Sequence, residues 1–385
     1  MPSVARPCGG GQRSDFKLAL SARPAYEQAR ADGSAFRRFR LALRFRRAPC
    51  KPKAPPPVPD KSVLSWPNFA VSVLGGVAAA VIFAVVVRGG LGGLLLAHVA
   101  PMPIMIVGFA FGLIHGATSA ILASVILSFW PSPVIGMGYA LLVAAPAWSA
   151  VYAASGAPRG GRDRLTANLP GWASLAPAVF LATAVIFWLI VASVIFGSVD
   201  EALNPIRARA FILLDLLVKE RDLGDKIDPT TLSRSVARAV PAFLAGYGLL
   251  IHVVNLWLAA RIAEASKLLG RPWPDIAKEF RLPKAVGGLF LSGIALTFFD
   301  GLAGPIGLVL ATTMGLLLAF QGLAVAHIFL RGSRSSALVL AIIYFTLGFL
   351  GWPILIFTAI GLADLIFNYR ARKADPGPAA MQKPD

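Results

Sequence analysis

Residues 304–330 read GPIGLVLATTMGLLLAFQGLAVAHIFL and contain no Lys, Arg, Asp or Glu. A helix that crosses a lipid bilayer needs about 20 mainly apolar residues, with a range of roughly 17–25. This stretch is therefore predicted to span a membrane, and it decides the fold class. The lipid bilayer is therefore the predicted environment of this stretch and of the chain around it, and a predicted partner.

Similar apolar stretches lie on both sides of it, between Asn68 and Tyr369. They predict an all-α, polytopic transmembrane helix bundle of about ten spans, with a range of eight to ten. The predicted spans are residues 69–87, 91–111, 113–130, 134–154, 172–197, 240–260, 285–299, 304–330, 337–350 and 352–368. The last two come from one block, 337–368, which is either a single long helix or two short ones. Gly348, Gly351 and Pro353 stand at its middle, where a turn is expected.

The composition supports a membrane protein, because 56% of the 385 residues are apolar and only 15% are charged, against about 25% charged in a typical soluble domain. The net charge of +18 is concentrated outside the apolar stretches. The loops 159–164, 261–284 and 331–334 are basic and are predicted to be cytoplasmic by the positive-inside rule. Two crossings within 337–368 place Arg370 on that side too, so both termini are predicted to be cytoplasmic, in a bacterial inner (plasma) membrane.

Three regions are predicted: a basic, Pro-rich, largely disordered tail (1–60), a transmembrane domain (61–373) and a short disordered tail (374–385). Residues 1–60 hold 13 Lys or Arg and 4 Asp or Glu. They are interpreted as a cytoplasmic tail, as a basic amphipathic segment for an anionic membrane surface, or as translated sequence upstream of the true start. The charge distribution gives no reason to expect a specific nucleic-acid partner. Both cysteines, Cys8 and Cys50, lie in this tail, which argues against disulfides and a Cys-based metal site in the bundle.

The long segment 198–239 is predicted to be extracytoplasmic, because its seven basic and seven acidic residues balance. Apolar positions at helical spacing predict a helix over 208–218, and Asp228-Pro229-Thr230 resembles a helix start. Both a cap over a cavity and a solvated connector fit this pattern.

Polar side chains at membrane depth are candidate sites, because burying them in lipid is costly. His252 and Asn255 are three residues apart and share one helix face, where they would bind a ligand or bond backbone groups of a neighbouring helix. Gln321 and His115 are further ligand-binding candidates. The default for Asp364, near the basic C-terminal end of the bundle, is a terminal ion pair. No catalytic motif such as G-x-S-x-G or H-E-x-x-H occurs, and no two histidines have metal-ligand spacing, so neither an enzyme, a cofactor nor a metal site is predicted.

Small residues in the first half suggest close helix contacts. Gly76, Ala80 and Ala84 are spaced four apart, which favours contact with a partner helix or ordinary packing within the chain. Prolines and glycines interrupt residues 101–120, as they do in the broken helices that form transporter binding sites.

Two resemblances follow from these stretches. Residues 316–331 (LLLAFQGLAVAHIFLR), Trp352-Pro353 and Gly361-Leu-Ala-Asp364 resemble the YybS-like predicted membrane proteins, a bacterial family with a domain of unknown function, over roughly residues 65–373. This resemblance implies a multi-pass fold. Residues 69–197, with the pattern at 101–120 and with Ala80 and Ala84, are similar to S components of energy-coupling factor (ECF) vitamin transporters. In that family, alanines four apart on the first helix contact the coupling subunit, although its members usually have about six helices.

The sequence therefore predicts a multi-pass membrane component that binds a small organic solute within its first six spans. The resemblance to S components implies a partner ATPase and coupling subunit, docked near Ala80 and Ala84. The alternative is a membrane scaffold that recruits cytoplasmic or envelope-synthesis proteins through its basic tail and loops. An integral membrane enzyme is disfavoured, because the sequence contains no recognisable catalytic motif.

Overall fold

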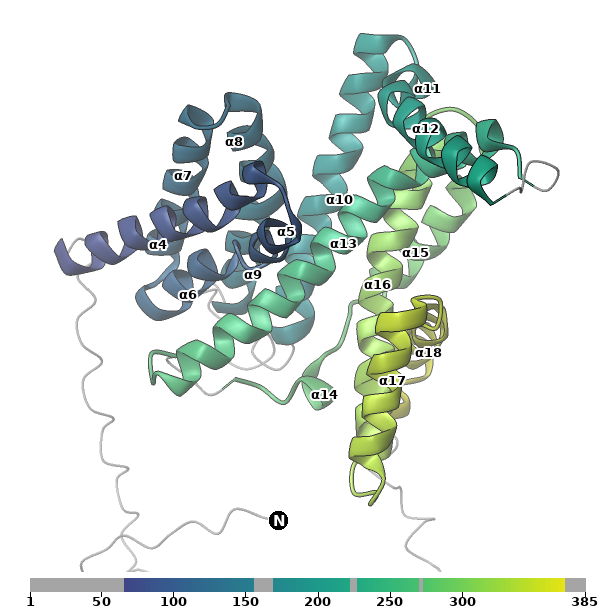
Figure 1. Cartoon of the computed structure of the whole chain (residues 1–385). Coiled ribbons are helices and arrows are strands. Elements are labelled where there is room, and N and C mark those ends of the chain that lie inside the picture. The colour runs from purple at the N-terminus through teal and green to yellow at the C-terminus, as the bar shows by residue number, and fades with distance from the viewer. Residues whose placement is uncertain (1–65, 156–168, 222–226, 270–272, 371–385) are drawn as a thin grey trace, which may run out of the picture. The chain divides into compact units, whose positions relative to one another are not determined.

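The computed structural model describes residues 66–155, 169–221, 227–269 and 273–370, all within one unit of the chain, residues 61–385. Every regular element in these residues is a helix (Figure 1), which confirms the all-α class. The predicted tails 1–60 and 374–385 and the loop 159–164 lie outside the described residues.

The helices divide into two groups along the chain. The first group consists of α4 (Trp66–Ala84), the 3-10 turn η1 (Val85–Arg88), α5 (Leu91–Ala97), α6 (Met102–Phe111), α7 (Leu113–Phe129), α8 (Pro133–Tyr139), the π-helical turn η2 (Ala140–Ala144) and α9 (Ala145–Ser155). The second group consists of α10 (Leu169–Phe196), α11 (Val199–Ala202), α12 (Asn204–Glu220), α13 (Pro229–Ala265), α14 (Ile276–Glu279), α15 (Ala285–Leu296), α16 (Ala303–Leu330), α17 (Ser336–Leu350) and α18 (Ile354–Phe367).

Six segments of the described residues are long and apolar enough to cross a membrane. They are Trp66–Ala84, Gly92–Phe111, Pro133–Ser155, Gly171–Phe196, Pro229–Ala265 and Ala303–Leu330. The other four predicted spans are also apolar helices, α7, α15, α17 and α18, but they have only 12 to 17 residues. At 1.5 Å per residue they are about 18 to 26 Å long, which is short of a hydrocarbon core of about 30 Å. All ten predicted positions are therefore helical, and six have the length of a full crossing.

The ambiguous block 337–368 forms two helices, α17 and α18. Gly351 separates them with a φ of +70°, a conformation that glycine adopts without steric cost. The helices α16 and α18 run parallel, because Thr358 Oγ1 donates to the Gly315 carbonyl at 3.1 Å and Gln321 Nε2 donates to Asp364 at 2.9 Å. The helix α17 therefore runs in the opposite direction, and the ends of α16 and α18 lie at the same end of the bundle. Which side of the membrane this end faces stays a prediction.

The longest helix of the described residues is α13, with 37 residues, or about 56 Å. It begins where the sequence predicts a helix start, because the Asp228 carboxylate accepts from the backbone N–H groups of Thr230 and Thr231 at 3.0 and 3.1 Å. The hydroxyl of Thr231 and these two amides hold the pKa of Asp228 below its usual range. The predicted extracytoplasmic segment 198–239 thus contains α11, α12 and the first part of α13.

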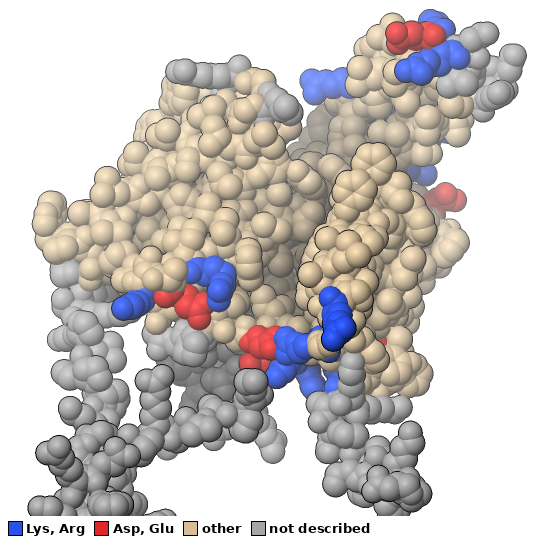
Figure 2. All heavy atoms as spheres, turned by 60° about the horizontal axis from the view of Figure 1, so that its bottom comes forward, with Lys and Arg blue, Asp and Glu red and all other residues tan. Residues whose placement is uncertain are grey.

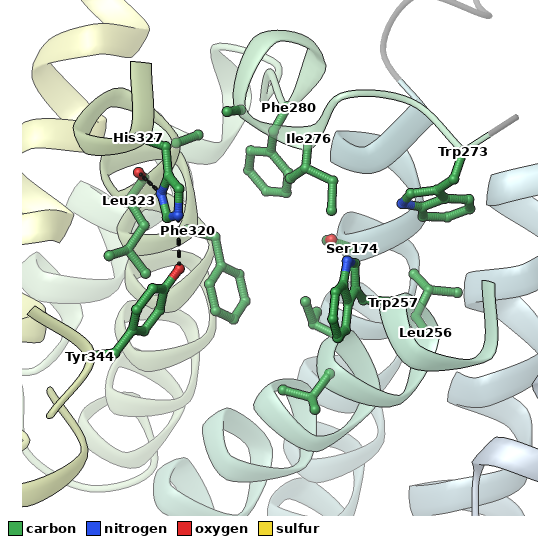
Figure 3. Close-up of a pocket in the computed structure, with 14 residues that line it drawn as sticks. Ser174, Leu256, Trp257, Trp273, Ile276, Phe280, Phe320, Leu323, His327 and Tyr344 are labelled. Atoms are coloured by element: carbon green, nitrogen blue, oxygen red, sulfur yellow. Dashed lines mark hydrogen bonds between the residues drawn. The ribbon is translucent and has the colours of Figure 1, made fainter. Parts of the chain in front are cut away.

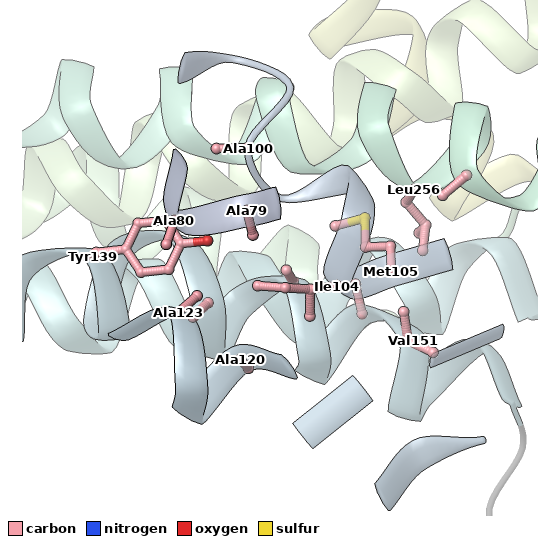
Figure 4. Close-up of a cluster of buried hydrophobic side chains, with 14 of the residues drawn as sticks. Ala79, Ala80, Ala100, Ile104, Met105, Ala120, Ala123, Tyr139, Val151 and Leu256 are labelled. Atoms are coloured by element: carbon pink, nitrogen blue, oxygen red, sulfur yellow. The ribbon is translucent and has the colours of Figure 1, made fainter. Parts of the chain in front are cut away.

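The packing of the first helices depends on small side chains. A cluster of buried residues around Ala79, Ala80 and Ala123 joins α4, α6, α7 and α13, and Tyr139 closes one side of it (Figure 4). Alanines let helix backbones approach closely, which is how helices associate where no hydrophobic effect drives them together.

Charged side chains are unevenly distributed over the surface. In the view of Figure 2 they gather in two groups, and a broad surface without charge separates them. Large apolar side chains cover much of the exposed surface, among them Phe187 and Phe243, which are 63% and 60% exposed. This pattern is expected of a protein whose middle contacts lipid.

Candidate ligand-binding site

A cavity of about 510 Å³ lies between α10, α13, α16 and α17. The chain between α13 and α15 closes one side of it, and residues 273–282 of that connection form the roof of the cavity (Figure 3). The lining residues are mainly aromatic and aliphatic. They are Ser174, Val253, Val254, Leu256, Trp257, Trp273, Ile276, Ala277, Phe280, Phe320, Leu323, Ala324, His327 and Tyr344.

The polar groups of the cavity are few and stand on two sides. On one side, His327 Nδ1 is 2.9 Å from the Leu323 carbonyl oxygen, and its Nε2 is 3.4 Å from the Tyr344 hydroxyl. On the other side, the indole nitrogen of Trp273 is buried and has no hydrogen-bond partner within the described part of the chain. Figure 3 shows this nitrogen facing the cavity. Buried donors are rarely left unpaired, so the Trp273 indole is a candidate donor to a bound molecule.

Two contacts at the protein surface hold the outer part of the roof. The backbone N–H of Trp273 donates to Glu264 at 3.1 Å, at the end of α13. Arg331, at the end of α16, donates to both oxygens of Asp275 at 3.0 and 3.2 Å. The Arg331 guanidinium holds the pKa of Asp275 below its usual range.

A buried network holds the inner part of the roof. Gln321 Oε1 accepts from the Leu282 backbone N–H at 3.0 Å, and Gln321 Nε2 donates to Asp364 at 2.9 Å. Arg370 pairs with Asp364 at 2.9 Å, with side chains only 5% and 3% exposed, and also donates to the Phe280 carbonyl at 2.6 Å. The predicted terminal ion pair of Asp364 is therefore present and buried. Gln321, a predicted ligand-binding residue, bonds Leu282 of the roof and Asp364 in this network.

The helices α16 and α18 touch backbone to backbone beside this network. A Cβ added at Gly361 would lie 3.0 Å from the Gly322 nitrogen and 2.7 Å from the Leu318 carbonyl carbon. The stretches around Gln321-Gly322 and Gly361-Leu-Ala-Asp364, which carry the sequence resemblance, therefore meet in space.

A family model described as "Predicted membrane protein (DUF2232)" matches residues 77–365. The chain belongs to this family. The match runs from within α4 to within α18 and so includes the cavity and the whole roof. The resemblance to YybS-like membrane proteins fits the DUF2232 family, and nothing in the comparisons supports the resemblance to ECF S components. No curated protein and no solved structure matches the chain.

In this DUF2232 protein, His252 and Asn255 share a buried face of α13, as their spacing predicts. Asn255 Nδ2 donates to the His98 carbonyl oxygen at 2.7 Å, in the break between α5 and α6. The ring nitrogens of His252 lie 2.7 Å from the Gly248 oxygen and 3.0 Å from the Val143 oxygen, the latter in the π-helical turn η2. Both side chains bond backbone groups, and neither is among the cavity-lining residues.

The predicted residues of the first half also pack within the chain of this DUF2232 protein. His115 Nδ1 is 2.8 Å from Ser72 Oγ, a buried contact between α7 and α4. Gly76 and Ala80 are buried, and a Cβ at Gly76 would lie 2.8 Å from a carbonyl oxygen of α7, while Ala84 is half-buried. The ridge of small residues therefore packs against α7 of the same chain, which agrees with the expectation of packing within the chain. Among the described residues no group of three His, Cys, Asp or Glu is placed to hold a metal ion.

Sequence reasoning missed the cavity because aromatic and aliphatic residues look alike whether they face lipid, another helix or an empty space. The available signal was His327, which the sequence places near the end of a span. In the DUF2232 structure it faces Tyr344 across the cavity wall, with ring centroids 5.9 Å apart.

Proposed function

We propose that this protein is a membrane-embedded binding component of a transport process for a small, mainly apolar molecule, and that the cavity beneath the roof is its site. The observation that carries the proposal is the cavity itself. Its volume of about 510 Å³ is within the roughly 300–1,000 Å³ of small-molecule sites, and its apolar walls with a few polar groups match their usual composition.

We also propose that the ligand reaches the cavity from the lipid bilayer. The helix α17 contributes Tyr344 to the cavity wall, yet α17 has no buried residue along its 15 positions. Few packing contacts hold it against the bundle, and elements with few buried contacts are the ones that open locally. An apolar molecule dissolved in lipid would enter by displacement of α17.

The proposed site does not lie wholly within the first six predicted spans. It lies between the fifth and sixth of them, α10 and α13, and the later helices α16 and α17. An ATPase that supplies energy remains part of it, but the buried ridge at Ala80 offers no docking surface. The exposed basic residues beside the roof, such as Lys267, Lys278 and Arg334, offer one. The same surface favours the second candidate, a scaffold that recruits other proteins.

The binding test uses the purified protein in lipid nanodiscs and the neutral fluorescent probe N-phenylnaphthylamine. Saturable binding is expected, over the partitioning seen in empty nanodiscs. Leu323→Trp places a larger side chain in the cavity and should abolish the saturable part. Leu338→Trp is the matched control, because Leu338 is 65% exposed on α17 and does not line the cavity. Equal binding by both variants would refute the cavity as the site.

Affinity purification from native membranes separates the two candidates. Under the transport proposal, an ATPase is recovered with the protein, and its ATP hydrolysis responds to the probe in the wild type but not in Leu323→Trp. Recovery of envelope-synthesis or other cytoplasmic proteins, unchanged by Leu323→Trp and without an ATPase, would favour the scaffold instead.

A further inference from the structure

The chemistry of the cavity narrows the class of ligand, an inference that rests on the proposed function. We infer that the part of the ligand held in the cavity is an uncharged ring system that carries a hydrogen-bond acceptor, such as a ketone oxygen, and that this acceptor binds the indole N–H of Trp273.

The uncharged character follows from the lining residues. None of the fourteen is Lys, Arg, Asp or Glu. A charged group moved into an apolar site without a partner of opposite charge loses its hydration and gains little in return. Two ion pairs beside the roof are closed on themselves, Arg331 with Asp275 at the protein surface and Arg370 with Asp364 in the buried network. A carboxylate or an ammonium group would therefore be rejected.

The acceptor follows from Trp273. The indole nitrogen carries a hydrogen and can only donate. It is buried, points toward the cavity and has no partner in the described part of the chain (Figure 3). Its position is fixed, because the Trp273 ring packs edge-on against Phe109 of α6, with centroids 5.8 Å apart. Its backbone N–H is held by Glu264. A buried donor that is held in this way and has no partner favours a ligand with an acceptor at that place, because binding would make the unmet hydrogen bond.

The other polar groups do not make the same demand. The Leu323 carbonyl can only accept, so His327 donates from Nδ1, and its Nε2 is left as the acceptor for the Tyr344 hydroxyl. Ser174 also has a partner of its own. The indole of Trp257 is a further donor on the cavity wall, but this residue is 47% exposed. Among the described lining residues, the buried donor with an unmet hydrogen bond is therefore that of Trp273.

The aromatic side chains that line the cavity favour a ligand that contains a ring system. Trp257 of α13 and Phe320 of α16 project into the cavity from opposite sides, and Phe280 of the roof lies at a third side (Figure 3). Aromatic side chains gain most from flat partners, in offset-stacked or edge-to-face arrangements. A flat ring would contact these walls more completely than a flexible chain would.

The test compares three molecules built on naphthalene in competition with N-phenylnaphthylamine in nanodiscs. Acetylnaphthalene carries a ketone, ethylnaphthalene has nearly the same shape without an acceptor, and naphthoate carries a charge. The ketone is expected to bind about three- to tenfold more tightly than the hydrocarbon, the range of one net hydrogen bond. Naphthoate is expected to bind at least about tenfold more weakly than the ketone.

Two variants assign the preference to its residue. Trp273→Phe keeps an aromatic ring but removes the donor, so ketone and hydrocarbon should bind equally and the hydrocarbon affinity should hold. Trp148→Phe is the matched control, because the Trp148 indole donates to the Leu113 carbonyl at 3.0 Å away from the cavity. It should keep the preference for the ketone.

The outcomes separate this inference from the proposed function. If ketone and hydrocarbon bind equally to the wild type and Leu323→Trp blocks both, the site stands and the acceptor inference is overturned. Naphthoate bound as tightly as the ketone overturns the uncharged character. If the fluorescent probe itself does not bind, the proposed function fails.

Discussion

Replacement of Gly361 by alanine should loosen the bundle at the crossing of α16 and α18. The added Cβ would overlap the Leu318 carbonyl oxygen and lie 2.7 Å from its carbonyl carbon, whereas carbon atoms pack best at about 3.5–4.0 Å. The two helices would therefore have to separate by more than about 1 Å. The obstructing atoms belong to the backbone of a buried helix, so a change of rotamer cannot relieve the overlap.

The expected magnitude follows from two opposing effects. Overpacking of a well-packed core costs about 1–3 kcal/mol, and the upper value applies because backbone atoms collide. Alanine is favoured over glycine within a helix by about 0.5–1 kcal/mol. The net loss is about 2 kcal/mol, which changes the unfolding equilibrium by roughly 25-fold.

The assay is unfolding in mixed detergent micelles, followed by circular dichroism, with Gly348→Ala as the matched control. Gly348 is also in the interior of a helix, α17, but a Cβ there would meet no atom within 4 Å. This control should gain about 0.5–1 kcal/mol, so the two variants are expected to differ in sign. A Gly361→Ala protein as stable as the Gly348→Ala protein would show that α16 and α18 do not cross this closely.

Three further predictions concern the polar contacts. Arg370→Met leaves the buried Asp364 carboxylate unpaired and should lower the free energy of unfolding by about 3–5 kcal/mol; the double variant with Asp364→Asn should recover most of the loss, and no recovery would show that the two groups do not act as a pair. The ion pair of Asp275 with Arg331 is exposed and contributes at most about 1 kcal/mol to stability. Because the pKa of Asp275 is lowered, this contribution is complete above about pH 4 and is lost as the pH falls through the lowered pKa. Asp275→Asn should mimic this loss at neutral pH, and it should be measured as faster release of the probe. His252→Phe removes the one hydrogen bond that a neutral imidazole can donate to either backbone carbonyl and should cost about 1 kcal/mol in the same unfolding assay; an unchanged stability would mean that this hydrogen bond carries no net energy.

The positions of the helices could be predicted from the sequence because apolar runs and their interruptions have direct physical causes. Gly112 separates α6 from α7 with a φ of +110°, and Gly351 separates α17 from α18. The exact extent of α13 could not be predicted in the same way. The predicted span 240–260 is shorter than the helix, which runs from Pro229 through Pro241 to Ala265, because packing of neighbouring helices can compensate the hydrogen bond lost at a proline.

The candidate site was much less predictable than the helices. The spacing of His252 and Asn255 correctly placed both on one face, but spacing does not tell whether a polar group bonds a ligand or a backbone carbonyl. Gln321 was recognised as an unusual residue at membrane depth, and its role in positioning the roof depends on Leu282 and Asp364, which are 39 and 43 residues away. Contacts at that separation depend on tertiary structure, which composition and periodicity do not specify.

The length of α13 has a mechanical consequence. Near its first turns, Arg238 pairs with Asp200 of α11 at 3.1 Å, and near its last residue Glu264 holds the backbone of Trp273. A helix of about 56 Å that tilts by roughly 10° about its midpoint displaces each end by about 5 Å. A displacement of α11 would thus move the Glu264 end of α13 in the opposite direction. Binding of an antibody fragment to α11 and α12 would then open or close the cavity at the other end of α13.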